Sequence, residues 1–149
     1  MIENTAFIRP AQRDDLDAIM TVERLCYPHP WTRDHFQQEL DNPAASVDLG
    51  LYGEELAGYH CYWLIAGEMQ ILNIAVAPPW RGRGMAQRLL DHAVERYIAN
   101  GLSQAWLEVR AGNATAIRLY QRCGFVHQGY RKAYYADGED AWLMVRSFP

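Results

Sequence analysis

The feature that most constrains the fold is the stretch 69–98, MQILNIAVAPPWRGRGMAQRLLDHAVERYI. Its residues 71–77 form a short apolar run that is rich in β-branched side chains and is closed by Pro78-Pro79, which predicts a buried strand. Gly82 and Gly84 follow, where a ligand could approach bare backbone without meeting a Cβ atom. Apolar residues then recur at helical spacing, which predicts a helix with one buried face. The expected buried face consists of Met85, Leu89, Leu90, Ala93, Val94, Tyr97 and Ile98.

A strand, a glycine turn and a helix N-terminus together predict an anion site. The first N–H groups of a helix have no intrahelical partner, and the helix dipole favours negative charge, so a phosphate or pyrophosphate is the expected ligand. A P-loop is excluded, because Met85 and Ala86 stand where Lys and Ser or Thr are required. A dinucleotide fingerprint fits poorly, because Gln87 stands where a third Gly or Ala is needed. A turn whose glycines only cap the helix remains the alternative.

The rest of the chain alternates strand and helix patterns. Asp14 or Asp15 is expected to cap a first helix, Thr32 a second, and Asn113 the last. The expected buried side of the first helix consists of Leu16, Ile19, Met20 and Leu25. The order is strand, two helices, three strands, helix, strand, helix and two strands, which predicts a mixed α/β fold. Because a helix joins the strand at 71–77 to the strand at 104–109, these two strands should be parallel.

Length and composition limit the class of protein. The 149 residues, half of them apolar, suit a single domain spanning 1–149. We expect no signal peptide, no membrane span and a cytoplasmic location. The net charge of −4 argues against direct nucleic-acid binding and favours a basic partner. Three separated cysteines and five histidines show no metal-ligand spacing, so no metal is expected.

Arg81, Gly84 and Ala86 occupy the fixed places of the pattern Arg/Gln-x-x-Gly-x-Gly/Ala. Here the stretch resembles the acetyl-CoA motif of the GCN5-related N-acetyltransferases. The resemblance extends over nearly the whole chain and is clearest at four places, namely Glu23 with Pro30-Trp31-Thr32, the segment 73–76, the segment 106–120, and Gly124-Phe125 with Tyr134-Tyr135 and 139–141. Within that superfamily the chain is most similar to the ribosomal-protein-alanine N-acetyltransferases of the RimI type. It departs from the pattern at Ala86, where glycine is commoner, and at Gly112, where serine is frequent.

The resemblance implies a fold, two substrates and a set of binding residues. The implied fold is a central mixed sheet of about seven strands, with helices on both faces and a splayed parallel pair in the middle. The implied donor is acetyl-CoA, and the implied acceptor is the N-terminal alanine of a basic small-subunit ribosomal protein. Donor contacts are implied for the backbone of Ile74, Ala75 and Val76, for Arg81, Gly82, Arg83, Gly84, Met85, Ala86 and Gln87, and for Asn113. Acceptor contacts are implied for Trp31, Tyr134 and Tyr135, although each could be ordinary packing.

Acetyl transfer to an amine requires a base for the amine and a proton for the departing thiolate. Glu108 lies in an otherwise apolar strand, where a carboxylate is unfavourable unless it faces a cleft or a partner. It is therefore the candidate base, and a surface pair with Arg110 is the alternative. Tyr120 is the candidate acid, because a phenol is protonated at neutral pH. Its alternative is a core aromatic at helical spacing.

Two rival functions remain open. An enzyme of the same fold that acetylates a small amine or a lysine would use Glu108 and the glycine turn equally well. A regulator that binds acetyl-CoA without catalysis would keep residues 81–87 but would need neither Glu108 nor Tyr120, and the presence of both argues against it.

Overall fold

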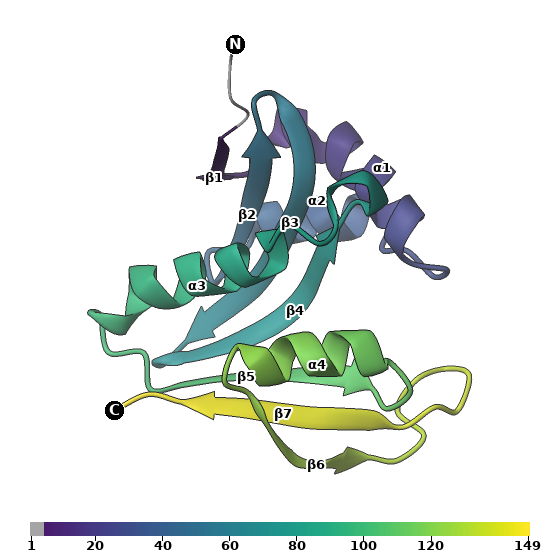
Figure 1. Ribbon diagram of the computed structural model, residues 1–149, viewed down its shortest axis with the longest axis vertical. Coiled ribbons are helices and arrows are strands. Elements are labelled where there is room, and N and C mark those ends of the chain that lie inside the picture. Colours follow the sequence, from purple (N-terminus) through teal and green to yellow (C-terminus); the bar gives the residue numbers. More distant parts are fainter. Residues whose placement is uncertain (1–4) are drawn as a thin grey trace.

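The computed structural model describes residues 5–149 and consists of a seven-stranded sheet with helices on both faces (Figure 1). The strand order is β1-β2-β3-β4-β5-β7-β6, in which β4 and β5 are parallel and the other neighbours are antiparallel. The elements are β1 (Ala6–Pro10), α1 (Leu16–Cys26), α2 (Arg33–Asp41), β2 (Ala45–Tyr52), β3 (Glu55–Ile65), β4 (Glu68–Val76), α3 (Met85–Ile98), β5 (Gln104–Arg110), α4 (Ala114–Arg122), β6 (Val126–Arg131) and β7 (Ala141–Ser147). The predicted order and fold class are confirmed.

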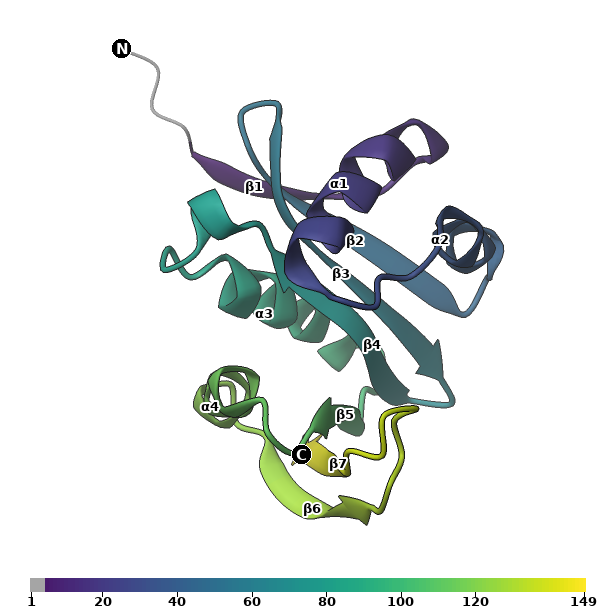
Figure 2. The ribbon, with the colours of Figure 1, turned by 90° about the vertical axis from the view of Figure 1, so that its right-hand side faces the viewer.

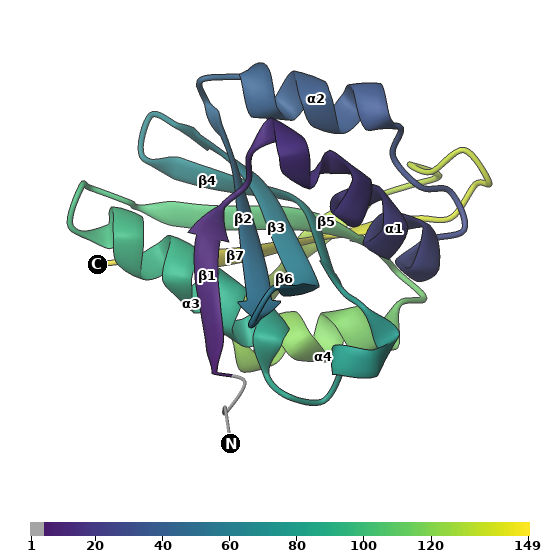
Figure 3. The same ribbon diagram turned by 90° about the horizontal axis from the view of Figure 1, so that it is seen from above.

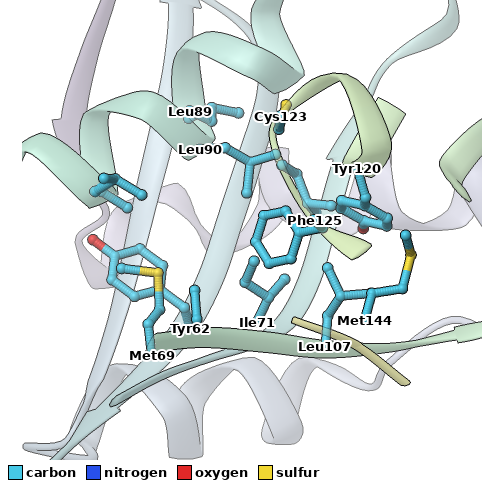
Figure 4. Packing of buried hydrophobic residues seen from close by; sticks show 14 of the residues in the cluster. Tyr62, Met69, Ile71, Leu89, Leu90, Leu107, Tyr120, Cys123, Phe125 and Met144 are labelled. Carbon is cyan, nitrogen blue, oxygen red and sulfur yellow. The ribbon is translucent and has the colours of Figure 1, made fainter. Parts of the chain in front are cut away.

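Two hydrophobic cores lie on opposite faces of the sheet. Helices α1 and α2 cover one face, and α3 and α4 cover the other (Figure 2). The larger core packs α3 and α4 on the sheet through residues such as Leu89, Leu107 and Phe125 (Figure 4). The smaller core packs α1 and α2 through residues such as Ile19 and Phe36. Strands β2, β3 and β4 are thus buried on both faces, which explains their long apolar runs, whereas β5 alternates between buried and partly exposed residues and β6 is mostly exposed.

The parallel pair in the middle of the sheet is short. Strands β4 and β5 are paired from Glu68 with Gln104 to Ile71 with Leu107, and no pairing between them continues beyond these residues of the described chain. Figure 1 shows β4 rising away from β5 toward its carboxyl end. The predicted splay of the pair is therefore present, and it opens the sheet at the end where the glycine turn follows β4.

Short polar side chains begin α2 and α4, as the sequence predicts, and a glycine begins α3. The predicted cap of α1 by Asp14 or Asp15 is wrong, because Asp15 precedes α1 but its carboxylate accepts from Arg9 and from the Gln12 N–H and makes no capping bond to α1. The Thr32 hydroxyl accepts a hydrogen bond from the His35 N–H at 3.1 Å, and the Asn113 side-chain oxygen accepts one from the Ala116 N–H at 3.2 Å. Helix α3 begins after Gly84, whose backbone lies in the left-handed region at φ 79°. These local features fix where α2, α3 and α4 start.

The expected buried side of α1 is wrong at Leu25, which is 60% exposed. Glu23 is buried instead, at 1% exposed. A prediction from helical periodicity assigns only apolar residues to the buried side. Glu23 is buried for a different reason, because polar groups of other elements surround its carboxylate. Ile98 at the end of α3 is also more open than expected, at 44% exposed, because the helix passes the edge of the core there.

Candidate active site

A cleft of about 880 Å³ opens where β4 and β5 diverge. Its walls come from the end of α1 and the loop after it, from the carboxyl half of β4 with the glycine turn, from the end of β5 and from α4. The predicted site residues that line it are Trp31, Ile74, Ala75, Val76, Arg81, Gly82, Gly84, Met85, Ala86, Gln87, Glu108, Asn113, Tyr120 and Tyr135. Arg83 and Tyr134 are not among its lining residues. The fold therefore gathers into one site segments as far apart in the sequence as those of Trp31 and Tyr135.

The backbone of β4 presents alternate residues to the cleft. The Ala77 N–H donates to the Ala57 carbonyl of β3 at 2.7 Å, so the alternation of an antiparallel ladder directs the backbone groups of Ala75 toward β3 as well. Those of Ile74 and Val76 point the other way, toward the gap left by β5. Within this segment, Ile74 and Val76 are thus the residues whose N–H groups could bind an extended ligand.

Three side chains contact the carbonyl groups of β4 that point into the cleft. The sequence predicted a role in the site for Arg81 but not for Tyr27 or Cys26. The Tyr27 hydroxyl donates to the Ile74 carbonyl oxygen. The Arg81 Nε donates to the Val76 carbonyl at 2.9 Å, and the Cys26 thiol also lies within 3.4 Å of this oxygen. Burial raises the pKa values of both Tyr27 and Cys26, so both stay protonated donors at neutral pH. No local pattern reveals the roles of Tyr27 and Cys26, because each is about 50 residues from its acceptor.

The glycine turn leaves its backbone uncovered. Gly82 and Gly84 both have φ near 79°, and a Cβ atom built on either would have no heavy atom of the described chain within 4 Å. Because α3 starts directly after Gly84, the unpaired N–H groups of its first turn face the same space. Arg83 instead packs its guanidinium over the Trp80 ring, 4.9 Å from the ring centroid. The turn therefore suits an anion that is bound by backbone groups.

Glu108 is the first residue of β5 beyond the last pair with β4. Its side chain is 12% exposed, and its Oε2 lies 2.9 Å from Nε of Arg131 at the end of β6. Arg110 does not pair with Glu108; it contacts Asp137 at 2.9 Å and Glu139 at 3.0 Å. The simple surface pair between Glu108 and Arg110 is therefore wrong, and the Glu108 carboxylate lies in the cleft wall.

Tyr120 lies across the cleft from β4 and β5, on α4. Its ring packs edge-on against Phe125, with 5.9 Å between the ring centroids, and contributes to the larger core (Figure 4). The hydroxyl makes no hydrogen bond to any of residues 5–149, although Tyr120 lines the cleft. Burial raises the pKa of this phenol well above its usual value. Tyr120 is thus both a core aromatic and a protonated group next to the cleft.

A buried carboxylate fixes the loop that carries Trp31. Glu23 accepts hydrogen bonds from the Tyr59 hydroxyl, from the Asn73 amide at 2.9 Å and from the Trp31 backbone N–H at 2.8 Å. The Trp31 ring stacks on His35, with 3.7 Å between the ring centroids. Because three donors satisfy its carboxylate, Glu23 is a structural support for this wall.

The loop between β6 and β7 forms the opposite wall. Tyr135 lines the cleft and lies under the Arg110 guanidinium, 4.0 Å from the ring centroid. Tyr134 is 51% exposed and packs edge-on against Tyr135, with 5.1 Å between the centroids. Figure 3 shows this loop and the loop after α1 at the same end of the sheet. The structure thus places Trp31 and Tyr135 on the cleft but leaves Tyr134 at its rim.

The cleft combines a backbone anion site, two outward N–H groups on a strand end, a carboxylate and a phenol. This set can bind a phosphate-bearing ligand with an amide-containing arm and can move protons at its end. Within the part of the chain that the structure describes, no group of three or more His, Cys, Asp or Glu could hold a metal ion. None of the helices in residues 5–149 is long and apolar enough to cross a membrane.

Known proteins are similar to this chain in sequence. The acetyltransferase (GNAT) family model matches residues 16–125. A protein of Bacillus subtilis (strain 168), provisionally named as a [ribosomal protein bS18]-alanine N-acetyltransferase, is 36% identical over 96% of both chains. The [ribosomal protein bS18]-alanine N-acetyltransferase of Escherichia coli (strain K12) is 32% identical over 93% of this chain and 95% of its own.

Solved structures of other proteins have the same fold as this chain. The ribosomal-protein-S18-alanine N-acetyltransferase from Escherichia coli superposes with a TM-score of 0.89 at 29% identity, over 96% of this chain and 94% of that one. Arabidopsis thaliana NAA60 in complex with acetyl-CoA superposes with a TM-score of 0.88 at 21% identity, over 97% of this chain and 99% of that one. The second likeness shows the fold alone.

Proposed function

The chain belongs to the acetyltransferase (GNAT) family, and we propose that it transfers the acetyl group of acetyl-CoA to the N-terminal alanine of a small-subunit ribosomal protein. The names of its relatives in Bacillus subtilis and Escherichia coli support this acceptor. The proposal also includes the roles of individual residues, which follow from the geometry of the cleft.

The observation that carries the proposal is the opening of the sheet after Ile71 and Leu107. Among residues 5–149 it leaves the N–H groups of Ile74 and Val76 without a neighbouring strand, directly before the glycine turn. An extended chain with amide groups can dock there as a further strand would. The same opening brings Glu108 to the end of that path. The same cleft would therefore bind the donor along β4 and hold the reacting groups next to Glu108.

The donor is expected to lie along β4. Gly82, Gly84 and the first turn of α3 would bind its pyrophosphate through backbone N–H groups, because no side chain covers them. The N–H groups of Ile74 and Val76 would bind the pantetheine arm. Asn113, which caps α4 and lines the cleft, would contribute a further polar contact. Arg81 would act mainly by holding the Val76 carbonyl.

The acceptor amine needs to lose a proton before it attacks the thioester carbonyl. An α-amino group has a pKa of about 7.7–8.0, so a single carboxylate gives sufficient assistance near neutral pH. We assign this role to Glu108, because it is the carboxylate at the point where the strands part. Arg131 contacts one oxygen from outside the cleft and would keep the side chain in place.

Tyr120 is assigned to the departing sulfur. Its raised pKa keeps the hydroxyl protonated, so a donor is always present. The same shift makes complete proton transfer unfavourable unless negative charge develops on the sulfur. Tyr120 would therefore act through a hydrogen bond that strengthens as the carbon–sulfur bond breaks.

The preference for an α-amino group over a lysine side chain follows from proton affinity. A lysine has a pKa of about 10.4, so far less of it is neutral at pH 7 than of an α-amine. The acidic chain, with a net charge of −4, would also attract a basic protein N-terminus. Ribosomal proteins have this character, and we place the reaction in the cytoplasm, where they are assembled.

The deciding experiment compares two peptides with acetyl-CoA and reads the products by mass spectrometry. One is a basic ribosomal N-terminal peptide that begins with alanine, and the other is the same peptide with its N-terminus blocked and its lysines free. We expect acetylation of the first peptide only. Equal modification of the blocked peptide would refute the N-terminal acceptor. Modification of neither peptide, with turnover of small amines, would favour the small-amine alternative.

A further inference from the structure

Arg110 has no part in the proposed chemistry, yet its guanidinium bonds two carboxylates and covers an aromatic ring at the cleft. It is the last residue of β5, on the same side of the strand as Glu108 and two residues after it. Its Nη1 donates to both carboxylate oxygens of Asp137, at 3.0 and 2.9 Å, and to Oε1 of Glu139 at 3.0 Å. These two carboxylates raise the pKa of Arg110, which stays charged.

The same guanidinium covers Tyr135. It lies 4.0 Å from the ring centroid, within the range of a cation–π contact. Tyr135 is part of the cleft wall, whereas Asp137 is 56% exposed and Glu139 is 34% exposed. Arg110 therefore connects the end of the β5 strand with the one aromatic ring of this loop that lines the cleft.

Backbone bonds give this loop its turn but do not hold the Tyr135 ring. The Gly138 N–H donates to the Tyr135 carbonyl at 2.9 Å, and the Tyr135 N–H donates to the Glu139 carbonyl at 3.2 Å. These bonds close the loop on itself. The orientation of the Tyr135 side chain depends instead on what packs against the ring, and Arg110 and Tyr134 are its charged and aromatic neighbours.

A second contact couples Arg110 to the start of α4. The Gly112 N–H donates to Oε2 of Glu139 at 3.0 Å, while Oε1 of the same side chain accepts from Arg110. A Cβ atom at position 112 would lie 2.7 Å from Oε2, so any larger residue there would displace the Glu139 carboxylate. Glycine at this position therefore permits Glu139 to bridge the two segments.

We propose that Arg110 is a positioning residue for the acceptor substrate, which holds Tyr135 against the cleft through its contacts with Asp137, Glu139 and the tyrosine ring. Donor binding does not depend on the Arg110 side chain. The glycine turn and β4 lie on the other side of the opening, and Asn113 bonds only the Arg110 backbone carbonyl, at 2.9 Å. The inference rests on the proposed function, since it presupposes a peptide acceptor in this cleft. It makes Arg110 a determinant of acceptor affinity.

The test is steady-state kinetics with the alanine-initiated peptide at saturating acetyl-CoA. For Arg110→Gln we expect KM for the peptide to rise about tenfold, the effect of about 1.4 kcal/mol, with kcat changed less than about twofold. The affinity for acetyl-CoA, measured by calorimetry, should be unchanged. Arg110→Lys should recover part of the loss, because it restores the charge but not the planar fork.

Arg118→Gln is the matched control. It is the same substitution on the exposed side of α4, and Arg118 makes no ion pair among residues 5–149. Its kinetics should equal those of the parent. Gly112→Ala is an independent test, because the new Cβ atom would displace the Glu139 carboxylate while Arg110 itself is unchanged. This variant should also have a raised KM for the peptide.

A double-mutant cycle distinguishes positioning of Tyr135 from a direct role. In a Tyr135→Ala background, Arg110→Gln should raise KM for the peptide little further. Additive effects, a lowered affinity for acetyl-CoA or an unchanged KM would each overturn the inference. If Arg110→Gln does not fold, Gly112→Ala and the conservative Arg110→Lys decide the question. Failure of the parent protein to acetylate the peptide would instead contradict the proposed function.

Discussion

Ile71 of β4 and Leu107 of β5 are the last parallel pair before the two strands diverge. Both side chains are buried, at 6% and 1% exposed, in the core beneath α3 and α4 (Figure 4). Packing therefore fixes the point where the sheet opens. Glu108 follows Leu107 directly. The core that holds the two strands together therefore also places Glu108, the proposed proton acceptor, where the opening begins.

Replacement of Glu108 by glutamine tests the proposed base. We expect turnover at neutral pH to fall by roughly 10²–10⁴, the usual contribution of general-base catalysis. The loss should shrink above the pKa of the acceptor amine, because the amine is then already neutral. The measurement is the pH dependence of kcat with the alanine-initiated peptide.

Glu95→Gln on the exposed side of α3 is the control for Glu108→Gln and should leave the pH profile unchanged. A defect of the same size at every pH would indicate that Glu108 orients the acceptor instead of deprotonating it. Normal activity would remove Glu108 from the mechanism.

Much of the fold follows from short-range patterns in the chain. Thr32 and Asn113 begin their helices through hydrogen bonds to residues three positions later, and Gly84 provides the left-handed backbone before α3. These interactions are local, so a single sequence is sufficient to predict them. The parallel pairing of β4 and β5 follows in turn from the helix that connects them.

The support of the site could not be predicted in the same way. Glu23 is hydrophilic and lies on a helix, so periodicity assigns it to the surface, yet its partners Tyr59 and Asn73 are 36 and 50 residues away. Tyr27 likewise reaches Ile74 across 47 residues. Such contacts depend on how α1 docks on the sheet, and local sequence contains no information on that docking.

Replacement of Tyr120 by phenylalanine tests the proposed acid. The buried ring stays, so the fold and the packing on Phe125 should be preserved. We expect slower acetyl transfer, and the slowing should be smaller for thioesters whose thiol is a better leaving group. Tyr130→Phe removes a hydroxyl from a tyrosine that is 69% exposed and serves as the control. Equal slowing for good and poor leaving groups would contradict the role.

Substitution at Gly84 tests the anion site. Gly84→Ala and Gly101→Ala both place a Cβ atom on a left-handed glycine with open space around it, one before α3 and one after it. Each should therefore destabilise the fold by a similar amount, about 1–2 kcal/mol. Only Gly84→Ala should also weaken acetyl-CoA binding, measured by calorimetry on the folded proteins. An unchanged affinity for acetyl-CoA in Gly84→Ala would contradict the backbone anion site.

Stability in acid should depend on His60, which is fully buried between β2, β4 and α3. Neither imidazole nitrogen has a hydrogen-bond partner within residues 5–149. Burial lowers the pKa of His60 to about 3. The unfolded chain protonates this group near pH 6.5, so below that pH it binds more protons than the folded chain, and stability falls as the pH falls. Between pH 7 and pH 5 the expected loss is about 2 kcal/mol.

His60→Leu removes the titrating group and retains an apolar side chain of similar size. We expect the variant to be at least as stable as the parent at pH 7, because two unsatisfied buried nitrogens are lost. The larger effect should appear at pH 5, where the parent has lost stability and the variant has not. His127→Leu, on the exposed edge strand β6, is the control and should keep the pH dependence of the parent. Chemical denaturation at the two pH values measures the difference, and a pH dependence in His60→Leu equal to that of the parent would show that other groups cause the acid sensitivity.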